Sequence, residues 1–449
     1  MTKDVTEGNS VKLILRFMIP LVLGNLFQQL YNVADSVIVG RYLGVNALAG
    51  VGQSASLTFL ILGFVNGCCS GFAIPVAQCF GAKQYSQMRR FVFNAEILSV
   101  ILAAVITTGT AFFCDNILHL MGTPQEIYND AYCYLLVIFL GIPFTFLYNM
   151  LSGIIRSLGD SKTPFIFLII STLFNIAGDL IFIIVFKMGV LGAALATIMA
   201  QALSGTMCLF YMRSHYDILV MEPKDRKADP GMIKRLLGMG LPMGLQFSIT
   251  AVGSIMLQSA INALGTVYVA SYAAALKIKQ LMMCPFDAIG ATMATYCGQN
   301  LGAGKIGRIK TGIRSGVLIG IVYGAIAGVI LYFFAGAMTT VFIDAGNIDV
   351  IAGSHQYLAC IGAFYPALSF VIIMRNVIQG LGYSGKAFFS GVFEMIARTL
   401  MSLIAIPAFG WSAACYTDVV AWLSGSAFLV ALIMFVMKDI SRKVHKIEE

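Results

Sequence analysis

Residues 156–201 read RSLGDSKTPFIFLIISTLFNIAGDLIFIIVFKMGVLGAALATIMAQ and join a polar loop to two long apolar runs. An acid, Asp179, lies inside the first run, and Asn175 precedes it by about one helical turn. An ionisable group at bilayer depth costs a few kcal/mol unless it is paired or neutralised. The acid in this run is therefore the first candidate for a functional residue.

The composition of the 449-residue chain is that of a membrane protein. Hydrophobic residues make up 59% of it and charged residues 11%, whereas about 25% of the residues of a soluble domain are charged. The first ten residues are polar, so we expect no removable signal peptide. The ten cysteines are scattered through apolar runs without Cys-x-x-Cys spacing, which favours small buried residues over disulfides or metal ligands.

Twelve apolar runs are long enough, at about 20 residues each, to span a bilayer as helices. Several contain Gly or Pro, which membrane helices tolerate where neighbours satisfy the freed backbone groups. The sequence therefore predicts an all-α polytopic membrane protein with twelve transmembrane helices. The runs cover residues 13–40, 47–79, 91–114, 127–154, 163–186, 190–212, 236–262, 268–297, 311–335, 352–380, 387–409 and 413–437.

The basic residues predict the orientation of these helices. If both termini are cytoplasmic, the opposite loops contain only Arg41 and Lys187 of the 29 Lys and Arg residues. An excess of Lys and Arg is typical of cytoplasmic loops. We therefore expect a multi-pass protein of the plasma (inner) membrane with both termini in the cytoplasm. The net charge of +8 reflects this orientation rather than nucleic-acid binding.

The two halves of the chain resemble each other. Pro20 has a counterpart in Pro242, and the motif Gln-x-x-Gly-Ala occurs at 78–82 and again at 299–303. Because six helices separate equivalent positions, the repeats have the same topology. We expect two pseudo-symmetric six-helix lobes that form a V-shaped central cavity, an arrangement typical of alternating-access transporters. The expected parts are an amino-terminal lobe at 1–212 (helices 1 to 6), a cytoplasmic linker at 213–235 and a carboxyl-terminal lobe at 236–449 (helices 7 to 12).

Polar side chains at helical spacing form a stripe on the first helix and another on the fifth. The first stripe ends at Asp35 and the second at Asp179, roughly 8 to 10 Å from the outer ends at 1.5 Å per residue. Thr197 lies at a similar depth on the sixth helix. The groups expected to meet are Asp35, Asn175, Asp179 and Thr197. The supporting members of the stripes are Gln28, Tyr31, Asn32 and Ser171.

Two carboxylates, an amide and a hydroxyl form a site of hard oxygen ligands that suits Na+. Two close carboxylates also raise one another's affinity for H+, so the chemistry suits either ion. The alternative is that Asp35 pairs with Arg41, while Asp179 reaches the interface near Lys187.

Charged residues also lie inside the predicted spans of the second half. Glu394 and Arg398 are four residues apart, the spacing of a stabilising pair on one helix. Asp418 lies near the outer surface, where we expect contact with water. The candidates for a cavity in the carboxyl lobe are Asp287, Lys279 and Arg375.

The segments RSLGDSKTP (156–164) and GVLGAALAT (189–197), with Asn175-x-x-x-Asp179 between them, closely resemble the multidrug and toxic compound extrusion (MATE) family. The resemblance extends over essentially the whole chain. It implies an antiporter of two six-helix lobes that exports organic, often cationic and amphipathic compounds in exchange for Na+ or H+. It also implies an amino-lobe cation site at the four residues Asp35, Asn175, Asp179 and Thr197.

The carboxyl lobe departs from some branches of that family, which carry acids in helices 7 and 10. This chain has no acid in either helix and has Arg375 in helix 10. We therefore expect ion coupling to reside in the amino lobe.

Two other functions compete with drug export. A lipid-linked oligosaccharide flippase of related fold needs a cationic cavity, for which the candidates are Lys277, Lys279, Arg375 and Arg398. An intramembrane enzyme needs a motif such as His-Glu-x-x-His, which the sequence does not contain, and there is no P-loop for ATP. We predict a transporter rather than an enzyme, without a cofactor or a metal other than Na+ as a coupling ion. The expected partners are small organic molecules and the lipid bilayer but no nucleic acid, and we expect a monomer.

Overall fold

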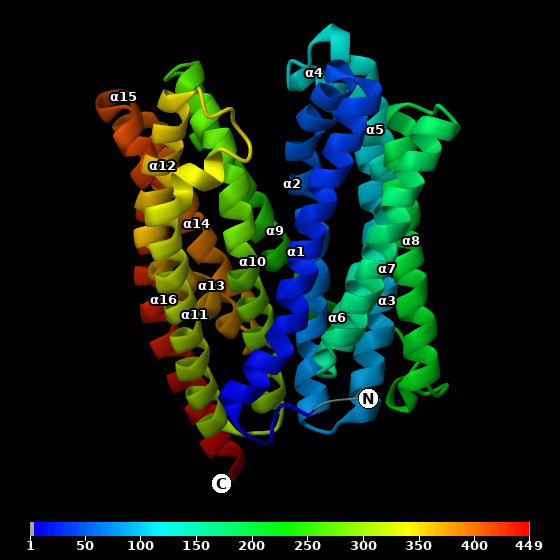
Figure 1. The fold of residues 1–449 in the computed structure, drawn as a ribbon. Helices are drawn as coiled ribbons and strands as arrows, with labels where there is room; N and C mark the ends of the chain where they lie inside the picture. The colour runs from blue at the N-terminus through cyan, green and yellow to red at the C-terminus, as the bar shows by residue number, and fades with distance from the viewer. Residues whose placement is uncertain (1–3, 449) are drawn as a thin grey trace. The chain divides into compact units, whose positions relative to one another are not determined.

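The computed structural model describes residues 4–448, including the side chains of residues 4–442, and in this range it contains helices and connections but no strand (Figure 1). The long elements are α1 (Ser10–Leu43), α2 (Val45–Gly81), α3 (Tyr85–Phe112), α5 (Gln125–Leu140), α6 (Ile142–Ser157), α7 (Lys162–Leu180), α8 (Val190–His215), α9 (Pro230–Asn262), α10 (Thr266–Gly302), α11 (Ile306–Thr339), α12 (Ile348–Ala363), α13 (Tyr365–Gly380), α14 (Ser384–Leu400) and α16 (Trp411–Glu448). The short elements are α4 (Cys114–Leu120), η1 (Ile181–Val185), η2 (Asp217–Leu219), η3 (Met401–Ala405) and α15 (Ile406–Phe409).

The long helices account for the twelve predicted spans. Within the described residues, nine helices are long and apolar enough to cross a membrane, and the bent pairs α5–α6 and α12–α13 each do so together. The twelfth, α10, has 37 residues, but it is less apolar because it carries Lys277, Lys279 and Asp287. The prediction of an all-α polytopic fold is confirmed, and the twelve-helix count agrees with it.

Proline explains the two bent pairs. α5 and α6 meet at 47°, and α12 and α13 meet at 55°. Pro143 and Pro366 lie in the first turn of the second helix of each pair. Proline is tolerated in a first turn because its missing N–H has no helical partner there, but it interrupts a helix that continues through it. The same residue type at matching places in both halves therefore produces the same break.

By its contacts the described chain divides into two units. Unit 1 contains Leu23–Ser248 and unit 2 contains Val5–Val22 with Ile249–Glu449. The division falls inside α1 and α9, whereas the repeats of the sequence divide at the polar segment 213–235. The lobe boundaries at 212 and 236 stay a prediction about the repeats.

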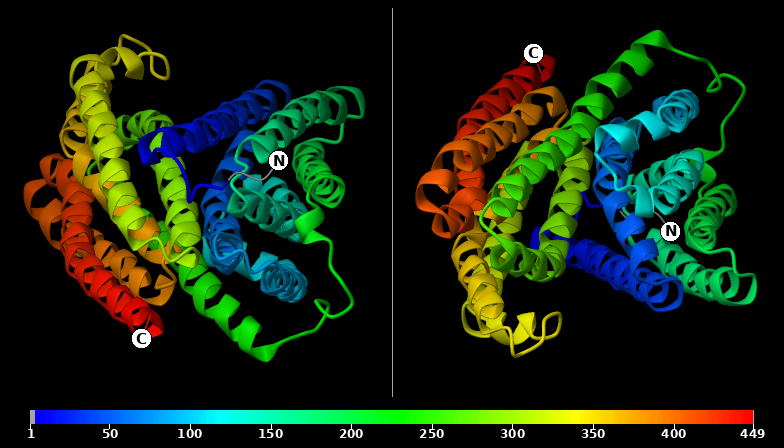
Figure 2. Two further views of the ribbon diagram at one scale, coloured as in Figure 1. Left: turned by 90° about the horizontal axis from the view of Figure 1, so that it is seen from below. Right: turned by 90° about the horizontal axis from the view of Figure 1, so that it is seen from above.

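The connection from α8 to α9, green in Figure 2, is bound to α3 within unit 1. Arg89 pairs with Asp225 at 2.5 Å, and Ser86 donates to the same carboxylate at 2.9 Å. Arg90 pairs with Asp229 at 2.8 Å. The carboxylate of Asp225 is buried, and these hydrogen bonds hold its pKa below the usual value although burial alone raises it. The polar connection is thus a fixed part of unit 1.

Asp160, in the connection from α6 to α7, organises the first turn of α7. Its carboxylate accepts bonds from the backbone N–H of Lys162 and Thr163 at 3.0 and 3.1 Å. It also accepts the hydroxyls of Thr163 and Tyr216 at 2.7 and 2.8 Å. Burial raises the pKa of Asp160, but these four bonds outweigh burial and leave the pKa below its usual value. The acid of the RSLGDSKTP segment therefore has a structural role at this loop.

Replacing Asp160 with Ala is expected to loosen the start of α7. A lost cap costs about 1 kcal/mol, which corresponds to a roughly fivefold rise in hydrogen exchange of residues 162 and 163. Because the folded pKa is lowered, the stabilisation is complete at neutral pH and disappears as the pH falls through that pKa. Hydrogen-exchange mass spectrometry tests this, with the start of α8 as the internal control. Unchanged exchange at 162 and 163 contradicts the role.

Candidate functional site

The candidate site lies where α7 and α8 pack against each other in unit 1. Asp179 is the second-last residue of α7, and the π-helical turn η1 begins two residues after it. Single π turns inside helices are frequent at functional sites. The chain then reverses at Gly189, whose φ of 62° a residue with a Cβ adopts only with strain. α8 begins at the next residue and carries Thr197 back past Asp179 and Asn175.

Thr197 connects three helices of unit 1 through its hydroxyl. Tyr31 on α1 shares a hydrogen bond of 2.9 Å with it, and the Asn175 amide donates to it at 3.4 Å. The Thr197 hydroxyl itself donates to the backbone carbonyl of Ala193 at 3.1 Å. Groups from α1, α7 and α8 are therefore brought together at one point.

Asp35 and Asp179 are the two acids of this site, and both are buried, with 7% and 0% of the residue exposed. Their carboxyl groups are close enough to interact with each other. Among the described residues, no donor reaches Oδ1 of Asp35, either carboxylate oxygen of Asp179, or Oδ1 of Asn175. Buried polar atoms are almost always hydrogen-bonded. Four acceptor atoms without donors indicate a place for a cation or a proton.

Tyr134 on α5 also belongs to the site, and the sequence did not single it out as a site residue. It is buried, and its ring hydroxyl interacts with the charges of both Asp35 and Asp179. The available signal was its counterpart Tyr357 in the second repeat. The sequence does not distinguish a tyrosine whose hydroxyl serves a site from a tyrosine whose ring only packs in the core.

Other predicted members of the stripes lie outside this network. Gln28 and Asn32 are exposed, and the Asn32 amide donates to Gln29 at 3.3 Å. Ser171 is buried, but its hydroxyl donates to the backbone carbonyl of Leu168 at 2.9 Å. A helical stripe therefore included residues that point away from the cluster.

The competing pairs predicted at the outer interface do not form within the described chain. Arg41 and Lys187 are both exposed, and neither makes an ion pair with Asp35 or Asp179. The acid pair therefore has no fixed cation in unit 1. Its two carboxylates, with the oxygens of Asn175 and Thr197, are the groups that would hold Na+ or share H+.

Comparison with known proteins identifies the family. Residues 20–181 and 242–404 each match the MatE family model. The chain belongs to the MatE family. The MatE proteins are membrane transporters rather than enzymes, and they need no cofactor. The double match agrees with the internal repeat of the sequence.

Relatives of this MatE chain have been described in several bacteria. The probable multidrug resistance protein YpnP of Bacillus subtilis is 30% identical over 379 residues, which are 84% of each chain. The multidrug export protein MepA of Staphylococcus aureus is 23% identical over 438 residues, or 95% of this chain and 94% of MepA. A solved outward-facing multidrug resistance MATE transporter matches with a TM-score of 0.90 and 22% identity, covering 98% of this chain and 99% of that one. This structural likeness shows the shared fold.

The second unit of this MatE protein contains a different arrangement of charges. Asp418 is buried and binds Lys279 at 2.5 Å and Arg398 at 2.9 Å. Glu394, also buried, pairs with Arg375. The predicted Glu394–Arg398 pair on one helix and the predicted contact of Asp418 with water are therefore wrong. Each side chain instead reaches a partner on a neighbouring helix, where burial leaves no solvent to compete.

The three residues predicted for a cavity in the carboxyl lobe differ in their contacts. Lys279 and Arg375 are bound in these ion pairs, whereas Asp287 on α10 is exposed and interacts with the charge of Arg375. The sequence placed the three in one set because all lie in apolar spans, but two of them have internal partners.

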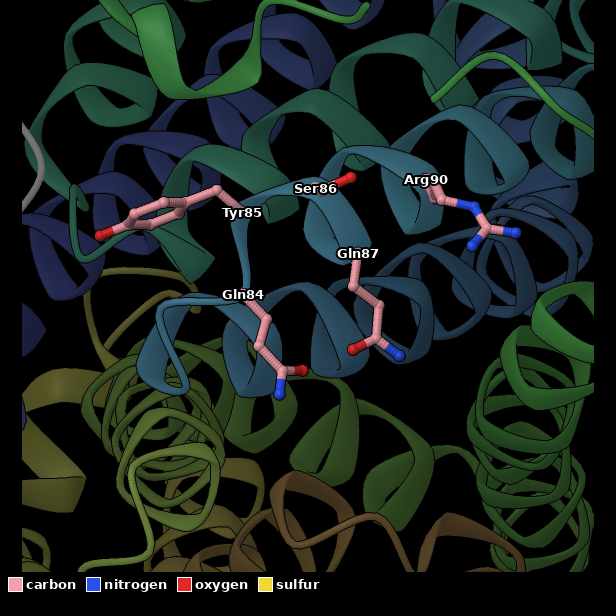
Figure 3. A pocket seen from close by; sticks show the side chains of 5 residues that line it. All are labelled: Gln84, Tyr85, Ser86, Gln87 and Arg90. Carbon is pink, nitrogen blue, oxygen red and sulfur yellow. The ribbon is translucent and has the colours of Figure 1, made fainter. Parts of the chain in front are cut away.

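A cavity of about 520 Å³ opens at the start of α3 in unit 1, as Figure 3 shows, and is lined by Gln84, Tyr85, Ser86, Gln87 and Arg90. It contains no acid. The 37 residues of α2, roughly 55 Å at 1.5 Å per residue, separate it along the chain from the end of α1 that carries Asp35. The cavity therefore is not part of the acid-pair site.

Proposed function

We propose that this MatE protein is a secondary active antiporter that exports organic compounds, often cationic and amphipathic, in exchange for H+ or Na+. The observation that carries the proposal is the buried pair Asp35 and Asp179, in which three of the four carboxylate oxygens have no donor in the described chain. The relatives named as multidrug resistance and multidrug export proteins support the class of substrate. The proposed orientation has both termini in the cytoplasm, and the protein acts as a monomer in the plasma membrane.

The acid pair provides a physical basis for coupling. Two like charges 4 Å apart repel by about 4 kcal/mol at an effective dielectric constant of 20. Binding of H+ or Na+ removes this repulsion, and ion release restores it. An ion changes a conformational equilibrium only by its difference in affinity for the two states. We therefore propose an alternating-access cycle in which the ion-bound acid pair favours access from one side of the membrane. The ion-free pair then favours access from the other side.

The lipid-linked oligosaccharide flippase is the weaker candidate. It depended on four basic side chains that were free to bind a phosphate. Three of them, Lys279, Arg375 and Arg398, are paired with Asp418 or Glu394. A cation already paired to a buried carboxylate attracts a further anion only weakly, so the charges of unit 2 do not favour a phosphate ligand.

The purified protein in vesicles allows the coupling ion to be identified directly. We expect uptake of a fluorescent organic cation when Na+ alone, or H+ alone, is more concentrated inside the vesicles than outside. The ion that drives uptake should also move in the opposite direction, which a pH-sensitive dye or radioactive Na+ records. Vesicles with the Asp35→Asn, Asp179→Asn variant serve as the matched control. Uptake that responds to neither gradient contradicts the proposed antiport.

A further inference from the structure

Asp418 on α16 is held by three donors of unit 2. Lys279 Nζ lies 2.5 Å from its carboxylate and Arg398 Nε lies 2.9 Å from it. The hydroxyl of Tyr357 donates to the same group at 2.6 Å. The side chains of Asp418, Lys279 and Arg398 are 3%, 14% and 6% exposed. This set of four residues, the Asp418 cluster, is thus a closed site in which two cations of the chain surround one acid.

The backbone around the Asp418 cluster repeats that around the acid pair of unit 1. In both units a π-helical turn follows the helix that carries a charged site residue, as η1 after α7 and η3 after α14. Each turn leads to a reversal at a glycine with the same conformation. Gly189 has φ 62° and ψ −143°, and Gly410 has φ 63° and ψ −140°. The helices before and after each reversal pack side by side within their own unit, α7 against α8 and α14 against α16 (Figure 1).

The register of the two units makes their site residues equivalent. Thr197 is the eighth residue of α8, and Asp418 is the eighth residue of α16. Tyr134 is the tenth residue of α5, and Tyr357 is the tenth residue of α12. In unit 1 the tyrosine interacts with the acid pair, and in unit 2 it donates to Asp418. Asp418 therefore stands in unit 2 where Thr197 stands in the acid-pair site of unit 1, with the equivalent tyrosine beside each site.

The two equivalent sites differ in what balances the acid. In unit 1 neither Asp35 nor Asp179 forms an ion pair within the described chain. In unit 2 the ammonium group of Lys279 and the guanidinium group of Arg398 are both supplied by the chain itself. We propose that the Asp418 cluster is a second cation site in which these tethered cations permanently take the role that a free coupling ion has in unit 1.

The surrounding charges keep further cations out of this site. Lys279 also lies 5.7 Å from the ring centre of Trp422, a cation–π contact that holds its ammonium group in place. Arg375, paired with Glu394, adds a second ion pair on the neighbouring helices. Among these buried residues there are three cations and two acids. A free Na+ or H+ is therefore repelled from the Asp418 cluster, and the acid pair of unit 1 is the site that exchanges ions. The part of this inference that concerns coupling rests on the proposed function of unit 1.

Removing the tethered cations is expected to make the site take up a free one. The test begins from a chain with Asp35→Asn and Asp179→Asn, in which unit 1 no longer responds to ions. Adding Lys279→Met and Arg398→Gln leaves Asp418 without a cation. The melting temperature of this variant should rise by about 2 to 4 °C when Na+ replaces choline or when the pH is lowered from 8 to 6. The starting chain should show neither rise. Adding Asp418→Asn should abolish the response.

Three results of this experiment overturn the proposal. The first is a variant without tethered cations that responds to neither Na+ nor acid. The second is a starting chain whose unit 2 already responds. The third is a variant without tethered cations that fails to fold, even in Na+ or at acid pH, until Asp418→Asn is added. Such a result means that Asp418 accepts no free cation in place of the tethered ones.

Counting bound ions in the folded, unaltered protein provides an independent measurement. Equilibrium dialysis with radioactive Na+, or proton release for an H+-coupled protein, should give one ion per chain, and none for Asp35→Asn with Asp179→Asn. A second ion that survives these substitutions overturns the tethered-cation proposal but leaves the antiport proposal intact. Binding that the substitutions do not change contradicts the proposed function of unit 1 instead.

Discussion

Replacing Asp35 or Asp179 with Asn is expected to lower ion-driven efflux of an organic cation by roughly 5- to 150-fold, the range of typical coupling free energies. Asn keeps the size of each side chain but removes its charge, so the pair loses its affinity for H+ or Na+. Both residues are buried, and three of their four carboxylate oxygens have no donor in the described chain. Efflux from cells or uptake into vesicles measures the effect.

Controls separate lost coupling from lost folding. Asp217→Asn makes the same chemical change at an exposed position of unit 1 and should leave efflux unchanged. Thr197→Ala and Tyr31→Phe remove the 2.9 Å hydrogen bond between α1 and α8 but keep both carboxylates, so their effect should be smaller. Exchange of substrate in the absence of an ion gradient should persist in the Asn variants. Unchanged ion-driven efflux in both variants contradicts the assignment of coupling to this pair.

Replacing Asp418 with Asn is expected to destabilise the folded protein strongly. The substitution leaves the charges of Lys279 and Arg398 buried without an acid, although both side chains are at most 14% exposed. Removing one partner of a buried ion pair typically costs about 3 to 5 kcal/mol. The melting temperature in detergent and the yield of folded protein measure the loss.

Two comparison variants test the cause of that loss. Asp349→Asn changes an exposed acid of unit 2 and should leave the melting temperature unchanged. Combining Asp418→Asn with Lys279→Met and Arg398→Gln should recover part of the stability, because no buried charge is then left unpaired. An Asp418→Asn protein that melts like the unaltered chain contradicts the buried ion-pair account.

The sequence predicted those features that depend on neighbouring residues along the chain. Apolar length located the spans because a helix must cover the bilayer with apolar side chains. Pro143 and Pro366 marked both breaks because proline acts on its own helix. Asp35 and Asp179 stood out because a carboxylate is costly in an apolar run wherever its partner lies. Their depth along two helices then followed from the rise per residue.

Contacts between distant segments were beyond this reasoning. Asp418 is paired with Lys279, 139 positions away, whereas the helical spacing of Glu394 and Arg398 suggested a local pair that does not form. Asn32 and Tyr31 were equally good members of one stripe, and only the rotation of α1 against α8 brought Tyr31 to Thr197. A helical period gives a face of a helix but not the neighbour that this face contacts.

The sequence by itself thus determined a twelve-helix membrane protein with an acid pair at matched depth in its first half. The tertiary structure decided which charges are available. It left three of the four carboxylate oxygens of Asp35 and Asp179 without a donor in the described chain, and it gave Asp418 two cations. The physical reason is that the cost of a buried charge depends on the groups within a few ångströms of it, and in unit 2 packing brings those groups from three different helices.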